Sequence, residues 1–208
     1  MFETLLSFSI ATLALAISPG PDNIYVLTQS LVNGTKSGIA TTAGLISGCI
    51  VHTTLLAFGV SAIITASKEL FYGLEILGAC YLLYLAYKVY KSNERISLAE
   101  NAPKKSYLKL YKTGVIMNLL NPKVLIFFLA FFPGFLWDDP EVSGGNTVAQ
   151  FYILGVVFMV ISFITFSAIA LAAGRISSLL LKWKSMGVVL KWLQIVVFIG
   201  IAVFILLP

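Results

Sequence analysis

The chain has 208 residues, of which 59% are hydrophobic and only 11% are charged. An ordinary soluble domain has about a quarter charged residues, so this composition excludes a water-soluble fold. The net charge of +5 does not indicate a nucleic-acid-binding surface, because the cations cluster between apolar tracts, a pattern that reports membrane topology.

Six apolar tracts account for nearly the whole length. A helix needs about 20 apolar residues to cross ~30 Å of hydrocarbon, and each tract is long enough. We place the spans near residues 3–31, 37–66, 70–90, 112–136, 147–173 and 187–207. The sequence therefore predicts an all-α polytopic membrane protein with a single transmembrane domain over residues 1–208.

The first span is interrupted by Ser18-Pro19-Gly20-Pro21-Asp22-Asn23. Two prolines and a glycine cannot continue a regular helix. Backbone groups freed by such a break are tolerated at membrane depth only where they line a cavity or are buried in protein. We therefore expect the first helix to break near mid-membrane beside an internal cavity and to restart at Ser18-Pro19 or at Asp22.

The second span contains the single histidine, His52, and a stripe of small residues formed by Ala40, Gly44 and Gly48. His52 is either a proton relay or a hydrogen-bonded interior residue. The stripe suits close helix packing, either within the chain or in a homodimer. Cys49 in this span and Cys80 in the next are expected to be small buried thiols, because their spacing suggests neither a metal site nor a disulfide.

The third span carries Tyr81, Tyr84 and Tyr87 at helical spacing. Two interpretations stay open for these tyrosines: part of a cavity wall, or a packing or interfacial role. Glu75 lies near the start of the span and is expected at the membrane interface, where it can remain hydrated.

The fourth span is interrupted by Asn121-Pro122-Lys123. Asn121 followed by Pro122 is typical of an N-cap with proline at the first helical position, so a half-helix is expected to restart here. Each break carries one ionisable residue, Asp22 or Lys123, that costs at least ~2.5 kcal/mol in hydrocarbon. The charges indicate a shared polar site, or alternatively a mutual salt bridge that locks the breaks together.

Lysine and arginine mark the orientation of the spans. Twelve of the fourteen cations fall at the first, third and fifth connections, which the positive-inside rule places in the cytoplasm, so both termini are expected outside. The two groups of three spans then have opposite orientations, as in a 3+3 inverted repeat. We expect the first repeat over about 1–91, a cytoplasmic linker over about 92–111 and the second repeat over 112–208.

The proline motif at residues 18–23 resembles the Pro-Gly-Pro signature of the LysE/RhtB family of bacterial amino acid exporters. Residues 78–85 are similar to the third helix of that family, and residues 114–135 to its fourth, although Gly134 stands where the family commonly has glutamine. The resemblance implies an inner-membrane exporter driven by the proton gradient. The motif residues that it carries over are Pro19, Gly20, Pro21, Asp22, Asn121, Pro122 and Lys123.

A neutral amino acid such as threonine, homoserine or leucine would fit one anion and one cation near mid-membrane. We expect the substrate carboxylate at Lys123 and its ammonium at Asp22, with Asn23 and Asn118 in the same site and with Asp22 or His52 coupling transport to protons. No catalytic residue, metal or cofactor is expected, since the spans hold no nucleophile with a base and no ligand cluster. The alternatives are an exporter of another small solute or cation, and a non-transporting membrane scaffold.

Overall fold

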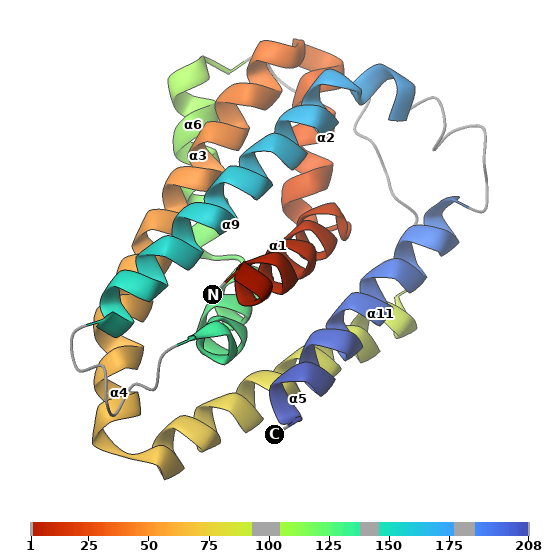
Figure 1. Cartoon of the computed structure of the whole chain (residues 1–208). Coiled ribbons are helices and arrows are strands. Elements are labelled where there is room, and N and C mark those ends of the chain that lie inside the picture. The colour runs from red at the N-terminus through yellow and green to blue at the C-terminus, as the bar shows by residue number, and fades with distance from the viewer. Residues whose placement is uncertain (1, 93–104, 138–145, 177–185, 208) are drawn as a thin grey trace.

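The computed structural model describes residues 2–92, 105–137, 146–176 and 186–207. Within these ranges every regular element is a helix, which confirms the all-α membrane fold (Figure 1). Four helices are long and apolar enough to cross a membrane. The number rises to six if each of two sharply bent helix pairs counts as one span.

The first half of the chain contains a bent pair and two long helices. The pair α1 (Phe2–Ile17) and α2 (Pro21–Asn33) is bent by 59°. Next comes α3 (Thr35–Leu55), which widens into a π-helical stretch, η1 (Leu56–Val60), and continues as α4 (Ser61–Ala66). The last element of this half is α5 (Lys68–Lys91). These bounds agree with the three predicted spans.

The second half repeats this order of elements. Its bent pair consists of α6 (Tyr107–Leu119) and a segment formed by α7 (Pro122–Ile126), a π-helical stretch, η2 (Phe127–Phe131), and a 3-10 turn, η3 (Phe132–Phe135). The bend is 50°. Two long helices follow, α9 (Asn146–Leu171) and α11 (Met186–Leu206).

The expected start of the fourth span near residue 112 is wrong. Helix α6 begins at Tyr107 because the Ser106 side chain accepts a hydrogen bond from Lys109 N and caps it. Most of the linker expected at 92–111 lies outside the described residues.

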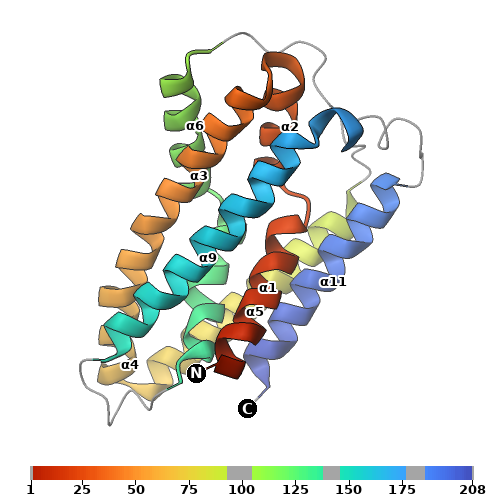
Figure 2. The same ribbon diagram turned by 45° about the horizontal axis from the view of Figure 1, so that its top comes forward.

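The helices form two groups with α1 between them. Helix α3 packs against α2, α6 and α9 in one group, and α5 pairs with α11 in the other (Figures 1 and 2). Helix α1 contacts both α9 and α11. The two bends therefore lie between these groups, where Asp22, Asn121 and Lys123 are buried, although Pro21 and Pro122 are exposed.

Glycine allows α3 and α6 to touch along their backbones. A Cβ on Gly44 would lie 2.0 Å from Tyr111 O, and one on Gly114 would lie 2.4 Å from Thr41 O. A Cβ on Gly48 would lie 2.6 Å from Asn118 Oδ1. The small-residue stripe is therefore used within the chain, and a homodimer would need another surface.

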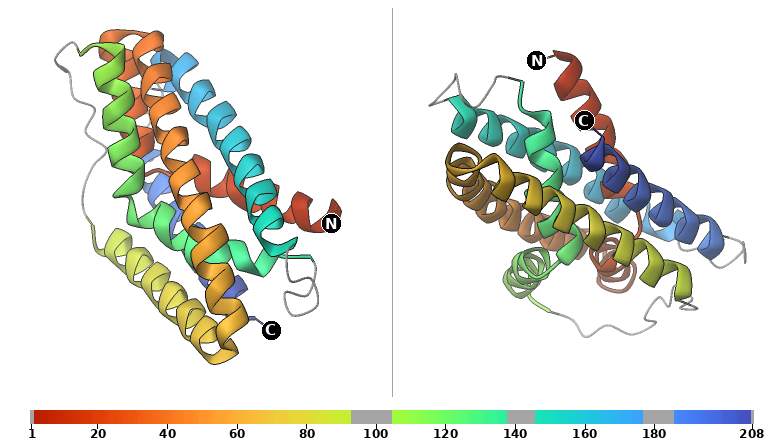
Figure 3. Two further views of the ribbon diagram at one scale, coloured as in Figure 1. Left: turned by 90° about the vertical axis from the view of Figure 1, so that its left-hand side faces the viewer. Right: turned by 90° about the horizontal axis from the view of Figure 1, so that it is seen from below.

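The helix termini lie at two opposite ends of the molecule. The last turn of α11 lies at the same end as α4, and the turn between α2 and α3 lies at the other end (Figures 2 and 3). In the view of Figure 2 the first turn of α1 also lies toward the end that holds α4. The turn between α2 and α3 contains Gly34, whose φ of 86° favours glycine.

The outward face of α5 carries tyrosines whose role the sequence did not decide. Tyr84 and Tyr87 are 53% and 58% exposed, which favours an interfacial or lipid-facing role over a place in a cavity wall. Cys80 is exposed as well, so the expectation of a buried thiol is wrong at this position. It is right for Cys49, which is buried.

Phenylalanine rings fill the core beyond the second break. Phe128 stacks on Phe132 with ring centroids 4.2 Å apart, and Phe8 from α1 meets Phe132 edge-on at 4.9 Å. Phe158 from α9 joins the same cluster at 5.0 Å from Phe128. Since α7, η2 and η3 run from the break toward the end that holds α4 (Figure 2), these rings fill the interior on that side.

Candidate functional site

The first break leaves three residues outside a helix. Helix α1 ends at Ile17, and α2 restarts at Pro21 with Gly20 in the N-cap position and no side-chain cap. The expectation that Ser18-Pro19 or Asp22 restarts the helix is therefore wrong. Proline occupies the first helical position, where its missing N–H costs nothing, and this places Asp22 in the first turn of α2.

The second break restarts as the sequence predicts. Asn121 is the N-cap of α7, and its Oδ1 accepts a hydrogen bond from Lys123 N at 3.0 Å. Pro122 occupies the first helical position. This cap satisfies one of the backbone donors that the break sets free.

Side chains that follow each restart satisfy the freed carbonyls of α1. Lys123 Nζ donates to Leu15 O at 2.8 Å and to Ser18 O at 2.7 Å. Asn23 Nδ2 donates to Ala16 O at 2.7 Å. The ammonium lies at the negative end of the α1 dipole, which favours a cation there.

Asp22 joins the breaks from the other side. Its Oδ2 accepts a hydrogen bond from Asn121 Nδ2 at 2.6 Å. Its Oδ1 is buried and has no hydrogen-bond partner, and the residue is only 5% exposed. The breaks are therefore joined through an amide and through backbone carbonyls, in place of the direct salt bridge that the sequence left open.

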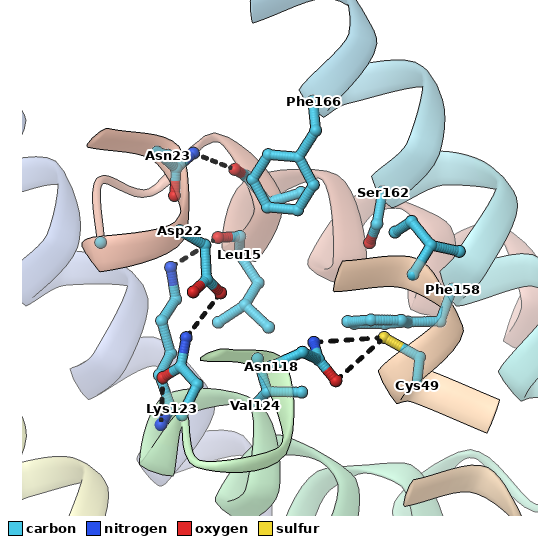
Figure 4. A pocket seen from close by; sticks show the side chains of 14 residues that line it. Leu15, Asp22, Asn23, Cys49, Asn118, Lys123, Val124, Phe158, Ser162 and Phe166 are labelled. Atoms are coloured by element: carbon cyan, nitrogen blue, oxygen red, sulfur yellow. Dashed lines mark hydrogen bonds between the residues drawn. The ribbon is translucent and has the colours of Figure 1, made fainter. Parts of the chain in front are cut away.

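A small cavity lies where the two breaks meet (Figure 4). Its volume is about 20 Å³, which is room for roughly one water molecule. Its walls come from both breaks, from α3 and from α9; the lining residues are Leu15, Ala16, Gly20, Asp22, Asn23, Ile46, Cys49, Asn118, Asn121, Lys123, Val124, Phe158, Ser162 and Phe166. An amino acid is larger than this volume, so binding one requires the walls to separate.

Six of the nine residues predicted for the binding site line this cavity: Gly20, Asp22, Asn23, Asn118, Asn121 and Lys123. The three prolines, Pro19, Pro21 and Pro122, do not. Pro21 and Pro122 are exposed and open the two restarted helices. The prolines shape the breaks, and the polar residues beside them face the interior.

His52 lies behind the cavity wall. Its Nε2 is 3.3 Å from Asn118 O, and its ring lies 5.4 Å from that of Phe128. It is 4% exposed and does not line the cavity, whereas its partner Asn118 does. This is the environment of a hydrogen-bonded interior histidine.

Sequence reasoning missed the wall that α9 contributes. Phe158, Ser162 and Phe166 recur every four residues and so share one face of the helix. The helix is mostly apolar, and serine is common in membrane helices, so Ser162 alone gives no signal. The only signal in the sequence was one hydroxyl between two phenylalanines on the same helix face.

The cavity brings together one carboxylate, one ammonium and three side-chain amides, in surroundings that are otherwise mostly apolar. Such a set can hold a small zwitterion by pairing each of its charges. Among the described residues, no three His, Cys, Asp or Glu side chains are placed to hold a metal ion. The paired charges suit reversible binding of a small zwitterion.

Comparison with known proteins finds translocators and efflux proteins. A family model described as LysE type translocator matches residues 13–208. The homoserine/homoserine lactone efflux protein of Salmonella typhimurium is 30% identical over 178 residues, which cover 85% of this chain and 84% of that protein. The leucine efflux protein of Salmonella choleraesuis is 27% identical over 197 residues, 94% of this chain and 91% of that protein. No solved structure matches.

Proposed function

The chain belongs to the LysE type translocator family, and from this premise we propose that it is a secondary active exporter of small neutral amino acids in the bacterial inner membrane. The names of its relatives, efflux proteins for homoserine and for leucine, support this class of substrate. They favour it over the alternatives of another small solute or cation and of a membrane scaffold.

One observation carries the proposed binding mode: a buried carboxylate oxygen, Asp22 Oδ1, has no partner and lines the same cavity as Lys123. The substrate ammonium would donate to Asp22 Oδ1. Lys123 Nζ has three donors and uses two on the carbonyls of Leu15 and Ser18, so the third can bind the substrate carboxylate. Each buried charge then acquires a partner of opposite sign.

Transport by this site requires alternating access to the two sides of the membrane. The phenylalanine cluster fills the interior on the side that holds α4, and its rings must part for the substrate to leave there. We propose that protons move in the opposite direction and that Asp22 exchanges a proton for the substrate ammonium. His52, through Asn118, is the second candidate for proton coupling.

We propose that the two halves are inverted repeats, with the cation-rich connections in the cytoplasm and both termini outside. Packing supports this proposal. The second helix of each half contacts the part of the other half's broken helix that precedes the break, as α3 contacts α6 and α9 contacts α1. The third helices of the halves, α5 and α11, pair with each other.

The test is efflux from proteoliposomes loaded with single amino acids, with the exterior more acidic than the lumen. We expect wild-type protein to release small neutral amino acids. Asp22→Asn should slow release by at least about tenfold, because it removes a charge-assisted bond of roughly 1.5–3 kcal/mol.

The matched control is Glu75→Gln, which removes a carboxylate from α5 outside the cavity wall and should leave efflux unchanged. Wild-type protein that moves no amino acid would contradict the proposed function. Asp22→Asn protein that exports at the wild-type rate would contradict the binding mode alone.

A further inference from the structure

The hydroxyl of Ser162 lacks the hydrogen bond that serine usually makes within a helix. In a helix, a serine or threonine hydroxyl commonly donates to the carbonyl four residues earlier. Thr165 on the same helix does so, with Oγ1 at 2.8 Å from Ile161 O, and Ser30 and Ser47 follow the same pattern. Ser162 is 2% exposed, yet its Oγ has no hydrogen-bond partner. A buried polar group of this kind calls for an explanation.

The position of Ser162 explains why its hydroxyl has no partner within the protein. Its side chain projects from α9 into the cavity, across from Asp22 (Figure 4). Other partnerless buried hydroxyls in the described ranges, such as those of Thr12, Thr42 and Thr53, do not line the cavity. Two unpaired polar atoms, Asp22 Oδ1 and Ser162 Oγ, thus face the cavity from opposite walls.

The surroundings of Ser162 are apolar. Phe158 and Phe166 lie one turn to either side of it on the same face of α9, and Leu15 and Ile46 complete the wall. A substrate held by its ammonium at Asp22 and its carboxylate at Lys123 would direct its side chain toward this wall. The wall offers mostly aromatic and aliphatic surface, and on α9 its one hydrogen-bonding side chain is that of Ser162.

We propose that Ser162 determines specificity by hydrogen bonding to a hydroxyl on a short substrate side chain. This inference rests on the proposed function and narrows its substrate class to hydroxylated amino acids of three or four carbons. A substrate of the same shape with a methyl in place of the hydroxyl leaves Ser162 Oγ unpaired in the bound state. The site discriminates against that analogue for this reason.

The experiment is a competition between homoserine and norvaline, which have the same shape but end in a hydroxyl and a methyl respectively. Proteoliposomes are loaded with equal amounts of both, and their efflux is compared. We expect wild-type protein to favour homoserine, and Ser162→Ala to reduce that preference by about 2- to 10-fold, the equivalent of one neutral hydrogen bond. Threonine and valine form a second pair for the same comparison.

Ser167→Ala is the matched control, because Ser167 also has a partnerless buried hydroxyl on α9 but lies outside the cavity wall. It should leave the preference unchanged. Ser162→Cys is nearly the same size as serine and bonds only weakly, so it should reduce the preference even if the alanine variant fails to fold.

The outcomes separate the two proposals. Wild-type protein that releases no amino acid contradicts the proposed function. Wild-type protein that exports amino acids but prefers norvaline, or treats the pair alike, contradicts the inference about Ser162. So does an unchanged preference in Ser162→Ala or Ser162→Cys, or an equal change in Ser167→Ala.

Discussion

The first broken helix restarts at Pro21 without a side-chain cap, whereas the second restarts at Pro122 beneath Asn121, which caps it. The freed carbonyls of α1 are bonded by Lys123 from the other half and by Asn23. At the end of α6, by contrast, Asn118 O accepts from the nearby Asn121 N at 3.1 Å and approaches His52 of α3. The first break thus depends on the second half of the chain, while the second is largely satisfied by its own residues.

From this difference we expect the first break, rather than the second, to change shape during transport. A break that its own residues satisfy can keep its shape as neighbouring helices separate. A break held by a side chain from the other half changes its hydrogen bonding when the halves separate. We therefore expect substrate arrival at Lys123 to change the geometry of the first break.

The largest effect is expected from Lys123→Met. This variant keeps the apolar stem, removes both bonds to α1, and leaves the carbonyls of Leu15 and Ser18 without a donor, at about 1–3 kcal/mol each. Efflux should be abolished and the melting temperature in detergent should fall clearly.

Lys191→Met is the control for this variant, because Lys191 Nζ donates to a single carbonyl, Ser92 O, at 2.7 Å near the end of α5. Lys191→Met should lower the melting temperature by less than Lys123→Met does. If the two variants melted at the same temperature, the first break would not depend on Lys123.

An intermediate effect is expected from Asn121→Ala, which removes the cap of α7 and the bond to Asp22 together. Loss of an N-cap costs about 0.5–2 kcal/mol. Asn121→Ser should restore the cap but not the amide donor to Asp22, so its free energy of unfolding should lie between those of alanine variant and wild type. Complete recovery in the serine variant would show that the link to Asp22 contributes nothing to stability.

The smallest effect is expected from Asn23→Ala, which removes one partly buried bond to Ala16 O, worth about 1 kcal/mol. Asn33→Ala is matched to it, since Asn33 Nδ2 donates to Gln29 Oε1 at 3.0 Å on the same helix. Only Asn23 lines the cavity, so only its variant should also lower efflux. Equal efflux from the two variants would exclude Asn23 from the binding site.

Much of the fold followed from local features of the chain. Five of the six spans begin and end close to where hydropathy places them, and both breaks occur at the proline motifs. Asn121 was recognisable as a cap because capping involves residues two or three apart. The early start of α6 also had a local signal, the cap residue Ser106, although the lysines of its first turns made the segment resemble a loop.

The wall on α9 and the restart of α2 were not predictable in this way. Several residues near the first break could begin a helix, and packing selected Gly20 as its N-cap. Ser162 lies in a mostly apolar helix, where its hydroxyl would normally bond to its own backbone. Its position in the cavity wall and its unpaired hydroxyl distinguish it from Thr165, and both are seen only in the tertiary structure.

By itself, the sequence determined that the chain is a helical membrane protein with two interrupted spans of opposite charge. Hydropathy and helix-breaking act over a few residues, so composition and motif suffice for these conclusions. The tertiary structure alone decided that Lys123 bonds to the carbonyls of α1 while one oxygen of Asp22 stays unpaired in the cavity. Those contacts join atoms about a hundred residues apart, and they depend on which helices pack together.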